Sequence, residues 1–225
     1  MSKTIDLEKK EGVYHLTMTD TESGNGLKDS FVDEFLEALD VVESDPSDTA
    51  LVLRSSDPKN WCVGVDLAWL ETQPDGYLNT FIGTLERLVL RLALVKVPTV
   101  ACINGHCFGG GALLAAACDF RYMRVDRGFI CFPEIDVKVA LTDALQAVID
   151  CLPNKKVVRE MVLLGTRLSG EQAEACDIID GSYVKEDLLN KALARADELK
   201  VKDRETYSQI KLALKRDLIN FQSGA

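Results

Sequence analysis

Three consecutive glycines, Gly109 to Gly111, stand directly before an almost wholly apolar run at 112–118. Glycine loses more conformational entropy on folding than any other residue, so this position must need bare backbone. At a helix start the first N–H groups have no partner within the helix, and the helix dipole favours negative charge. One interpretation is a docking point for an anion or for an oxygen that develops negative charge. A tight turn where a helix packs closely on a strand explains the glycines equally well.

The segment WCVGVDLAWL at 61–70 resembles this arrangement, because Gly64 follows a predicted strand and loop and precedes a helix-like run. Backbone N–H groups from two such segments can converge on one oxygen, as an oxyanion hole requires. Whether the two segments meet depends on the fold.

Glu134 is a third candidate, because it follows an apolar strand and a proline in FICFPEIDV at 129–137. Removal from water raises the pKa of a carboxyl group and suits it to general-base catalysis near neutral pH. The alternative interpretation is that Glu134 caps a turn after Pro133.

The elements that must position these residues alternate between strand and helix. Alternating apolar and polar residues predict a half-buried strand at 12–19. Helical spacing predicts a helix at about 31–42, opened by a capping box of Ser30 and Asp33. Further strands are predicted at 50–56, 98–103, 119–124 and 129–132, and further helices at about 78–95 and 112–118.

From Thr142 onward the chain is predicted to be helical, and one apolar stripe is expected along the last helix. Its members are Tyr207, Ile210, Leu214, Leu218 and Phe221. This order of elements predicts an α/β domain of repeated strand-strand-helix turns followed by a helical C-terminal section. We place the core at 1–168 and the helical section at 169–225.

Composition excludes several classes of protein. A net charge of −10 argues against nucleic acid as a partner, and the apolar stretches are too short for a membrane span, so no membrane role is expected. Seven scattered cysteines are typical of free thiols in a reducing cytosol. Since residues 1–13 have no apolar core of a signal peptide and residues 221–225 match no peroxisomal address, we expect a cytoplasmic location. With two histidines and no C-x-x-C motif, no metal site is expected.

Three blocks, in this order and spacing, resemble the signature of the crotonase (enoyl-CoA hydratase/isomerase) superfamily. They are KNWCVGVDL, KVPTVACINGHCFGGGALLAAACDFRY and FICFPEIDV. NGL at 25–27 and GTRLSGEQAEACDIIDGSYV at 165–184 resemble further blocks of that family. The resemblance implies a crotonase-like spiral fold, an acyl-CoA thioester as the substrate and an enolate intermediate. Coenzyme A is then part of the substrate, and no separate cofactor is expected.

Carried over residue by residue, the resemblance implies that Val65 and Gly110 supply the two oxyanion N–H groups. The glycines then let a thioester oxygen reach a helix start, where negative charge is favoured. Asp66 is expected to cap or orient its loop rather than to transfer a proton. The residues expected to bind substrate around these segments are Val63, Gly64, Asp66, Leu67, Gly109 and Leu113.

The resemblance also bears on the reaction. Hydratases of this family carry two glutamates, and here Leu113 stands at the first position and Glu134 at the second. Adding water requires that water be activated and carbon be protonated, which is difficult with one carboxylate. Moving a double bond needs one base, which removes a proton from C2 and returns it at C4. The pattern therefore favours Δ3-Δ2-enoyl-CoA isomerisation over hydration.

Family members often complete the CoA pocket with the C-terminal region of a neighbouring subunit, so a homo-oligomer is expected, a trimer or a dimer of trimers. The apolar stripe of the last helix can equally pack within its own chain. Lys211 and Lys215 lie one helical turn apart and could meet CoA phosphates, a solvated helix face being the alternative.

Other functions stay open. The loop VKVALTD after Glu134 lacks the glycine usual in the family, which predicts an unusual acyl pocket. A thioesterase, a decarboxylase, a dienoyl-CoA isomerase or a hydratase would share the oxyanion hole. A non-catalytic acyl-CoA-binding subunit is the alternative from another class. Nucleotide binding by the glycines is disfavoured, because G-x-G-x-x-G and the P-loop lysine are lacking.

Overall fold

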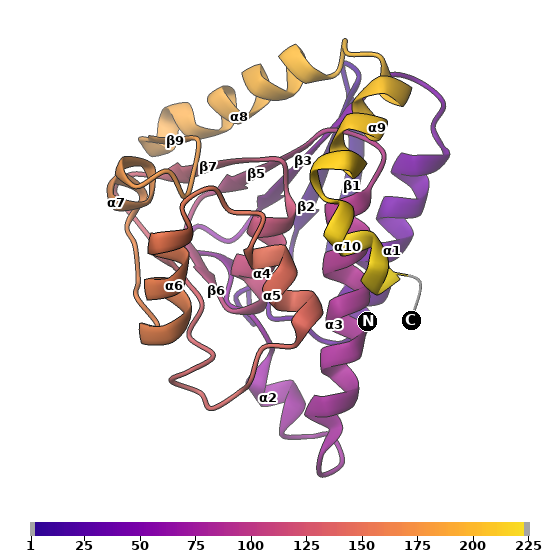
Figure 1. Ribbon diagram of the computed structural model, residues 1–225. Coiled ribbons are helices and arrows are strands. Elements are labelled where there is room, and N and C mark those ends of the chain that lie inside the picture. Colours follow the sequence, from indigo (N-terminus) through magenta and orange to yellow (C-terminus); the bar gives the residue numbers. More distant parts are fainter. Residues whose placement is uncertain (1–2, 223–225) are drawn as a thin grey trace.

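The computed structural model describes residues 3–222 (Figure 1). Within them six strands form a larger sheet in the order β1-β2-β3-β5-β7-β9, and three form a smaller sheet in the order β4-β6-β8. The strands of the larger sheet are β1 (Ile5–Lys10), β2 (Val13–Met18), β3 (Ala50–Ser55), β5 (Thr99–Ile103), β7 (Phe120–Arg124) and β9 (Gly181–Tyr183). Those of the smaller sheet are β4 (Asn60–Cys62), β6 (His106–Phe108) and β8 (Ile130–Cys131). β1 and β2 are antiparallel, and every other pair of neighbours in both sheets is parallel.

The predicted strand-strand-helix turns are confirmed, and with them the α/β fold class. Each turn places one strand in the larger sheet, the next in the smaller sheet, and then returns through a helix, as parallel strands require a crossover. The three turns are β3, β4 and α3 (Tyr77–Leu94); β5, β6 and α4 (Gly110–Ala117); and β7, β8 and α5 (Asp143–Ile149). The short helix α2 (Leu67–Leu70) lies between β4 and α3.

Helices cover both faces of the larger sheet. α8 (Lys185–Leu199) packs against β3, β5 and β7 on one face, and α3, α4 and α5 lie on the opposite side in Figure 1. The alternation at 12–19 predicted a half-buried strand, but all six residues of β2 are buried. Val13 packs in the core cluster beneath α8, whereas Leu16 and Met18 belong to the main core.

α1 (Asp29–Ser44) buries the predicted apolar face, but the capping box of Ser30 and Asp33 is wrong. The helix begins at Asp29, and its N-cap, Lys28, makes no side-chain capping bond. The Asp29 carboxylate instead accepts a hydrogen bond of 2.6 Å from the Tyr77 hydroxyl, which ties the start of α1 to α3.

The sequence had predicted a wholly helical C-terminal section, but the structure contains a strand there. β9 pairs with β7 in the larger sheet, and α8 covers that sheet, so residues 181–199 complete the core layer. The other helices before α8 are α6 (Lys155–Leu164) and α7 (Gly170–Ala175).

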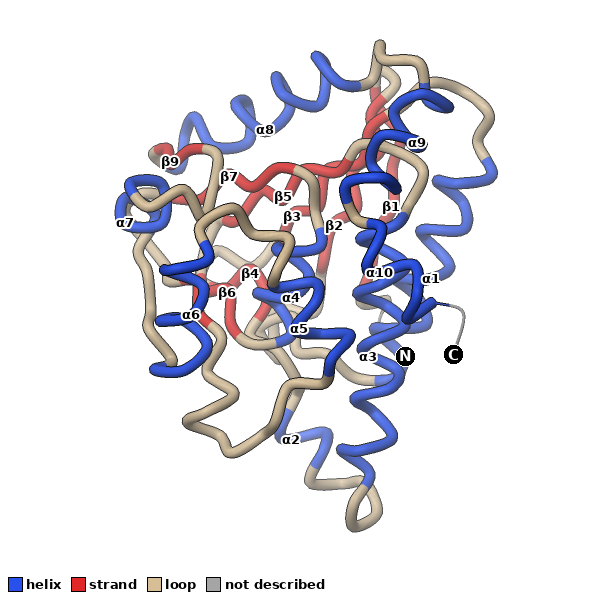
Figure 2. Tube along the Cα trace, in the orientation of Figure 1, coloured by secondary structure: helices blue, strands red, loops and turns tan. Residues whose placement is uncertain are grey.

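The predicted last helix is two helices, α9 (Arg204–Leu214) and α10 (Arg216–Gln222). Lys215 separates them with φ −106° and ψ 27°, which changes the phase of the apolar spacing. Leu218 is therefore 1% exposed, whereas Ile210 is 56% and Leu214 is 82% exposed, so the single stripe is wrong. α10 packs beside α3 and α5 (Figure 2).

No helix in the described part of the chain combines the length and the apolar character needed to cross a membrane.

Candidate active site

The two glycine segments lie against each other. A Cβ built on Gly64 would be 2.9 Å from the Phe108 carbonyl oxygen and 3.2 Å from the Gly110 nitrogen. A Cβ on Gly110 would be 3.6 Å from the Gly64 Cα. The two backbones are in direct contact, and Gly64 also has a φ of +87°, which favours glycine. The absence of a side chain at Gly64 and Gly110 thus allows the two backbones to approach each other closely.

Among the residues that the structure describes, the N–H groups of Val65 and Gly110 have no internal partners. The Leu27 N–H donates to the Gly64 carbonyl at 2.8 Å, and the Asp66 N–H donates to the Leu27 carbonyl at 3.0 Å. These bonds use the groups on either side of Val65, so the Val65 N–H points away from Leu27. Gly110 is the first residue of α4, where an N–H has no acceptor within the helix. Among residues 3–222 neither N–H donates a hydrogen bond.

Asp66 caps α2, as predicted, because its carboxylate accepts a 3.0 Å hydrogen bond from the Trp69 N–H. Leu67, the first residue of that helix, is 64% exposed. Val63 lies beside the turn that leads to Leu27, since its Cγ1 would be 3.2 Å from a Cβ on Gly24. These three predicted substrate residues flank Gly64 and Val65 along the chain.

Gly109 joins β6 to α4 and brings Glu134 to the same place. Its φ is +51°, and its N–H donates to the Cys131 carbonyl of β8 at 3.1 Å. A Cβ on Gly109 would be 3.4 Å from the Glu134 Oε1 atom. The carboxylate therefore lies next to the first turn of α4, and the three pieces that the sequence singled out meet.

The Glu134 side chain is half-buried, and its Oε2 atom is shielded from solvent without a hydrogen-bond partner in the described chain. Burial raises the pKa of this carboxyl group above its usual value. The turn after Pro133 is closed by main-chain bonds, from Asp136 N–H at 2.9 Å and Val137 N–H at 3.2 Å to the Pro133 carbonyl. The structure thus gives no support to a capping role for the side chain.

Leu113 lies one turn into α4, where its N–H donates to the Gly109 carbonyl at 2.9 Å. Its side chain is 1% exposed and belongs to the main core. An apolar residue therefore occupies the interior just behind the start of the helix.

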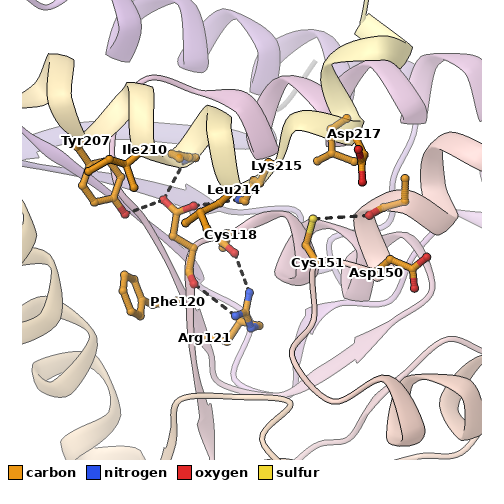
Figure 3. Close-up of a pocket in the computed structure, with 14 residues that line it drawn as sticks. Cys118, Phe120, Arg121, Asp150, Cys151, Tyr207, Ile210, Leu214, Lys215 and Asp217 are labelled. Atoms are coloured by element: carbon orange, nitrogen blue, oxygen red, sulfur yellow. Dashed lines mark hydrogen bonds and ion pairs between the residues drawn. The ribbon is translucent and has the colours of Figure 1, made fainter.

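Lys211 and Lys215, expected to meet CoA phosphates, both pair with Asp119 at 2.9 Å. Lys211 is 4% exposed, so a solvated helix face is wrong for it. Lys215, labelled in Figure 3, donates to the carbonyl of Ala117, the last residue of α4, at 2.8 Å. Ala117 comes seven residues after Gly110 in the helix, about 10 Å along the axis.

The cluster around Asp119 is structural in character. The carboxylate also accepts hydrogen bonds from the Thr99 N–H at 3.0 Å and the Tyr207 hydroxyl at 3.1 Å. Burial would raise the pKa of Asp119, but the two lysines outweigh it and lower that pKa to about 2. Burial lowers the pKa of Lys211 to about 8 despite the attraction of Asp119. The cations are also balanced by the carbonyls at the ends of α3 and α4, Ala93 and Ala117, which Lys215 binds.

A cavity of about 620 Å³ adjoins this cluster and is lined by the far end of α4, by β7, α5, α9 and α10. It is therefore distinct from the site around Glu134. Within residues 3–222 no group of His, Cys, Asp and Glu is arranged to hold a metal ion.

The groups that support the site were not predicted from the sequence. The fully buried Leu27 reaches Gly110, with its Cδ1 2.5 Å from a Cβ built there. Its only sequence signal was the resemblance of the NGL segment. The sequence does mark Asp119, because it is a charged residue between a buried helix and a strand.

Comparisons with known proteins show the family of this chain. The family model described as "Enoyl-CoA hydratase/isomerase" matches residues 8–223. The chain is 27% identical to enoyl-CoA delta isomerase 2, peroxisomal, of Arabidopsis thaliana, over 94% of this chain and 92% of that protein. It is 29% identical to enoyl-CoA hydratase domain-containing protein 2, mitochondrial, of Mus musculus, over 83% of this chain and 62% of that protein.

Solved structures show the same fold. An enoyl-CoA hydratase/isomerase family protein from Pseudomonas syringae matches with a TM-score of 0.88 and 21% identity, over 99% of this chain and 94% of that one. An enoyl-CoA hydratase from Bacillus anthracis matches with a TM-score of 0.85 and 19% identity, over 94% and 82% of the two chains.

Proposed function

Because this chain belongs to the enoyl-CoA hydratase/isomerase family, we propose that it is the isomerase kind of enzyme, which shifts a double bond from C3 to C2 of an enoyl-CoA. The observation that carries this proposal is that a carboxylate stands at only one of the two positions where hydratases of the family carry glutamate. Glu134 lies beside Gly109, whereas Leu113, at the position of a hydratase's first glutamate, is a buried apolar side chain. Two relatives are also named enoyl-CoA delta isomerases.

In the proposed mechanism the N–H groups of Val65 and Gly110 bind the thioester oxygen. Neither group has an acceptor within residues 3–222, and their segments are in contact. Negative charge develops on this oxygen when the enolate forms, so the two bonds strengthen in the transition state. The position of Gly110 at the start of α4 adds the positive end of the helix dipole.

Glu134 is the proposed base. Its carboxylate removes a proton from C2 of the 3-enoyl thioester, and the electrons of that C–H bond enter the conjugated enolate. The same group then returns the proton to C4, which leaves the double bond between C2 and C3 and restores the thioester carbonyl. The raised pKa of Glu134 brings it closer to the working pH, which favours both transfers.

The test is turnover of a 3-enoyl-CoA by the wild-type protein and by Glu134→Gln, followed by the absorbance of the conjugated 2-enoyl thioester. We expect activity in the wild type that is lost in the variant, while binding of the CoA ester survives. Faster hydration of a 2-enoyl-CoA than isomerisation would favour a hydratase instead. Tight binding of CoA esters without any turnover would favour an acyl-CoA-binding subunit.

We also propose a homo-oligomer, either a trimer or a dimer of trimers. Large apolar side chains are exposed on the single chain, which supports burial against further copies. They include Ile135, Val137, Leu163, Leu164, Ile210 and Leu214. A mass near 24.8 kDa in light scattering, that of one chain, would contradict this proposal.

The proposed location is the cytoplasm, and the proposed reaction needs no cofactor besides the CoA of the substrate. All seven cysteines are free thiols, which supports a reducing compartment. Because relatives are named peroxisomal and mitochondrial, fractionation of the source cells is the appropriate test.

A further inference from the structure

We infer that the Cys62 thiol is a positioning group for the Val65 N–H, acting through the Asn25 carbonyl and the 24–27 turn that holds the Val65 peptide. The inference rests on the proposed function, because it assigns Val65 to the oxyanion site. Cys62 would not touch the substrate but would set the direction of a group that does.

The Cys62 thiol links the end of β4 to the turn at residues 24–27. Cys62 is fully buried at the end of β4, and its Sγ donates to the Asn25 carbonyl at 3.1 Å. In the same turn, Leu27 accepts from the Asp66 N–H and donates to the Gly64 carbonyl, the groups on either side of Val65. One side chain thus fixes the turn that holds the Val65 peptide.

Asn25 is held in the conformation that this bond needs. Its φ is +58°, uncommon for a residue with a side chain, and it is fully buried. Its Nδ2 donates to the Ser55 hydroxyl at 2.8 Å and to the Trp61 carbonyl at 2.9 Å. The Asn25 carbonyl is therefore a fixed acceptor, which aligns the thiol opposite it.

Cys62 also contacts the other half of the site. A Cβ on Gly111 would be 2.3 Å from the Cys62 carbonyl oxygen and 2.9 Å from its Cβ, so the first turn of α4 rests directly on this residue. Cys62 thereby relates the Val65 segment to the Gly110 segment. Burial raises the pKa of Cys62 to about 12, so the thiol keeps the proton that it donates.

The expected consequence is specific to catalysis. An oxyanion N–H that is turned away from the developing charge lowers kcat more than it weakens binding of the ground-state ester. We expect Cys62→Ala to lower kcat about tenfold with KM within about twofold, a fraction of the effect of losing the donor altogether. Cys62→Ser, whose hydroxyl can donate to the Asn25 carbonyl in place of the thiol, should return kcat to within about threefold of the wild type.

Cys107→Ala is the matched control. Cys107 pairs with Cys62 in the smaller sheet and is also fully buried, so both variants remove one buried sulfur from the same sheet. We expect Cys107→Ala to keep kcat within about twofold after correction for folded protein. Equal losses of kcat in the two alanine variants would overturn the inference, as would an unchanged kcat in Cys62→Ala.

A second measurement separates this inference from the proposed function. Acetoacetyl-CoA forms an enolate whose oxygen resembles the proposed intermediate, and its ultraviolet absorbance reports the fraction enolised on the protein. We expect Cys62→Ala, but not Cys107→Ala, to bind less enolate than the wild type. If the wild type binds the enolate without isomerising 3-enoyl-CoA, the isomerase proposal fails while the role of Cys62 stands. If Cys62→Ala binds as much enolate as the wild type, the role of Cys62 fails.

Discussion

The Glu134 carboxylate lies against Gly109, so that a Cβ on Gly109 would be 3.4 Å from its Oε1 atom. Gly109 is the N-cap of α4, and the next residue, Gly110, carries one of the two proposed oxyanion N–H groups. The proposed base and the proposed donor are thus held by neighbouring residues of one buried helix start. Such a fixed arrangement needs little reorganisation when charge develops.

Gly109→Ala should lower both stability and kcat. The residue has φ 51° and ψ −119°, a strained conformation for a side chain that costs about 1–3 kcal/mol, and the new methyl group would approach Glu134. Urea denaturation and steady-state kinetics measure the two effects. Gly83→Ala is the control, because Gly83 lies within α3 with open space around its Cα. That change should add up to about 1 kcal/mol of stability and leave kcat unchanged; an equal loss in both variants would contradict the assignment of strain to Gly109.

Glu134→Gln should stabilise the protein at neutral pH while abolishing turnover. The pKa of Glu134 is raised by burial, so its protonated form favours the folded state. That contribution is complete below the ordinary pKa of 4.5 and is lost as pH rises through the folded value. We expect a higher Tm than the wild type at pH 7.5 and an equal Tm near pH 4. A lower Tm at pH 7.5 would show that the carboxylate makes stabilising contacts instead.

The raised pKa of Glu134 also predicts how activity depends on pH. The base is active only when ionised, so kcat/KM of the wild type should fall on the acid side at a pH above 4.5. The profile of kcat/KM against pH measures this limb, because it reports the ionisation of the free enzyme. An acid limb at or below 4.5 would contradict the desolvated base.

Gly110→Pro and Gly110→Ala together test the oxyanion donor. Both place a Cβ toward the movable end of Leu27, but only proline removes the N–H. Gly110 is the first residue of α4, a position at which proline is well tolerated. We expect Gly110→Pro to have a kcat about 100- to 1,000-fold below that of Gly110→Ala, with circular dichroism showing both variants folded. Similar kcat values in the two folded variants would remove Gly110 from the oxyanion site.

Much of the architecture could be predicted because it follows from local patterns. Apolar periodicity and turn residues gave the strands 50–56, 98–103 and 119–124 to within one residue of β3, β5 and β7. These strands depend on neighbours in sequence. The residues marked the two glycine segments and Glu134 as candidates, but the contacts of Gly64 with Gly110 and of Gly109 with Glu134 join distant segments and could not be derived from local patterns.

The errors arise where distant residues decide the outcome. β9 is three residues long and forms only because it pairs with β7, about 60 residues earlier. Lys211 and Lys215 resembled a solvated pair, because nothing near them in sequence announces Asp119, 96 residues before Lys215. The break of the last helix at Lys215 accompanies that same ion pair.

Asp119→Asn should destabilise the fold by about 3–5 kcal/mol, since it leaves two buried ammonium groups without their carboxylate. Adding Lys211→Met should recover part of this loss, because the second change removes one unpaired cation. Urea denaturation of the two single variants and the double variant measures the coupling. Lys211→Met alone should leave the KM for the CoA ester unchanged. Lys211 binds Asp119 and the Val97 carbonyl, and Asp119 follows the end of α4 that is opposite Gly110. A KM raised tenfold in this variant, with kcat unchanged, would instead return Lys211 to the phosphate-binding role first expected of it.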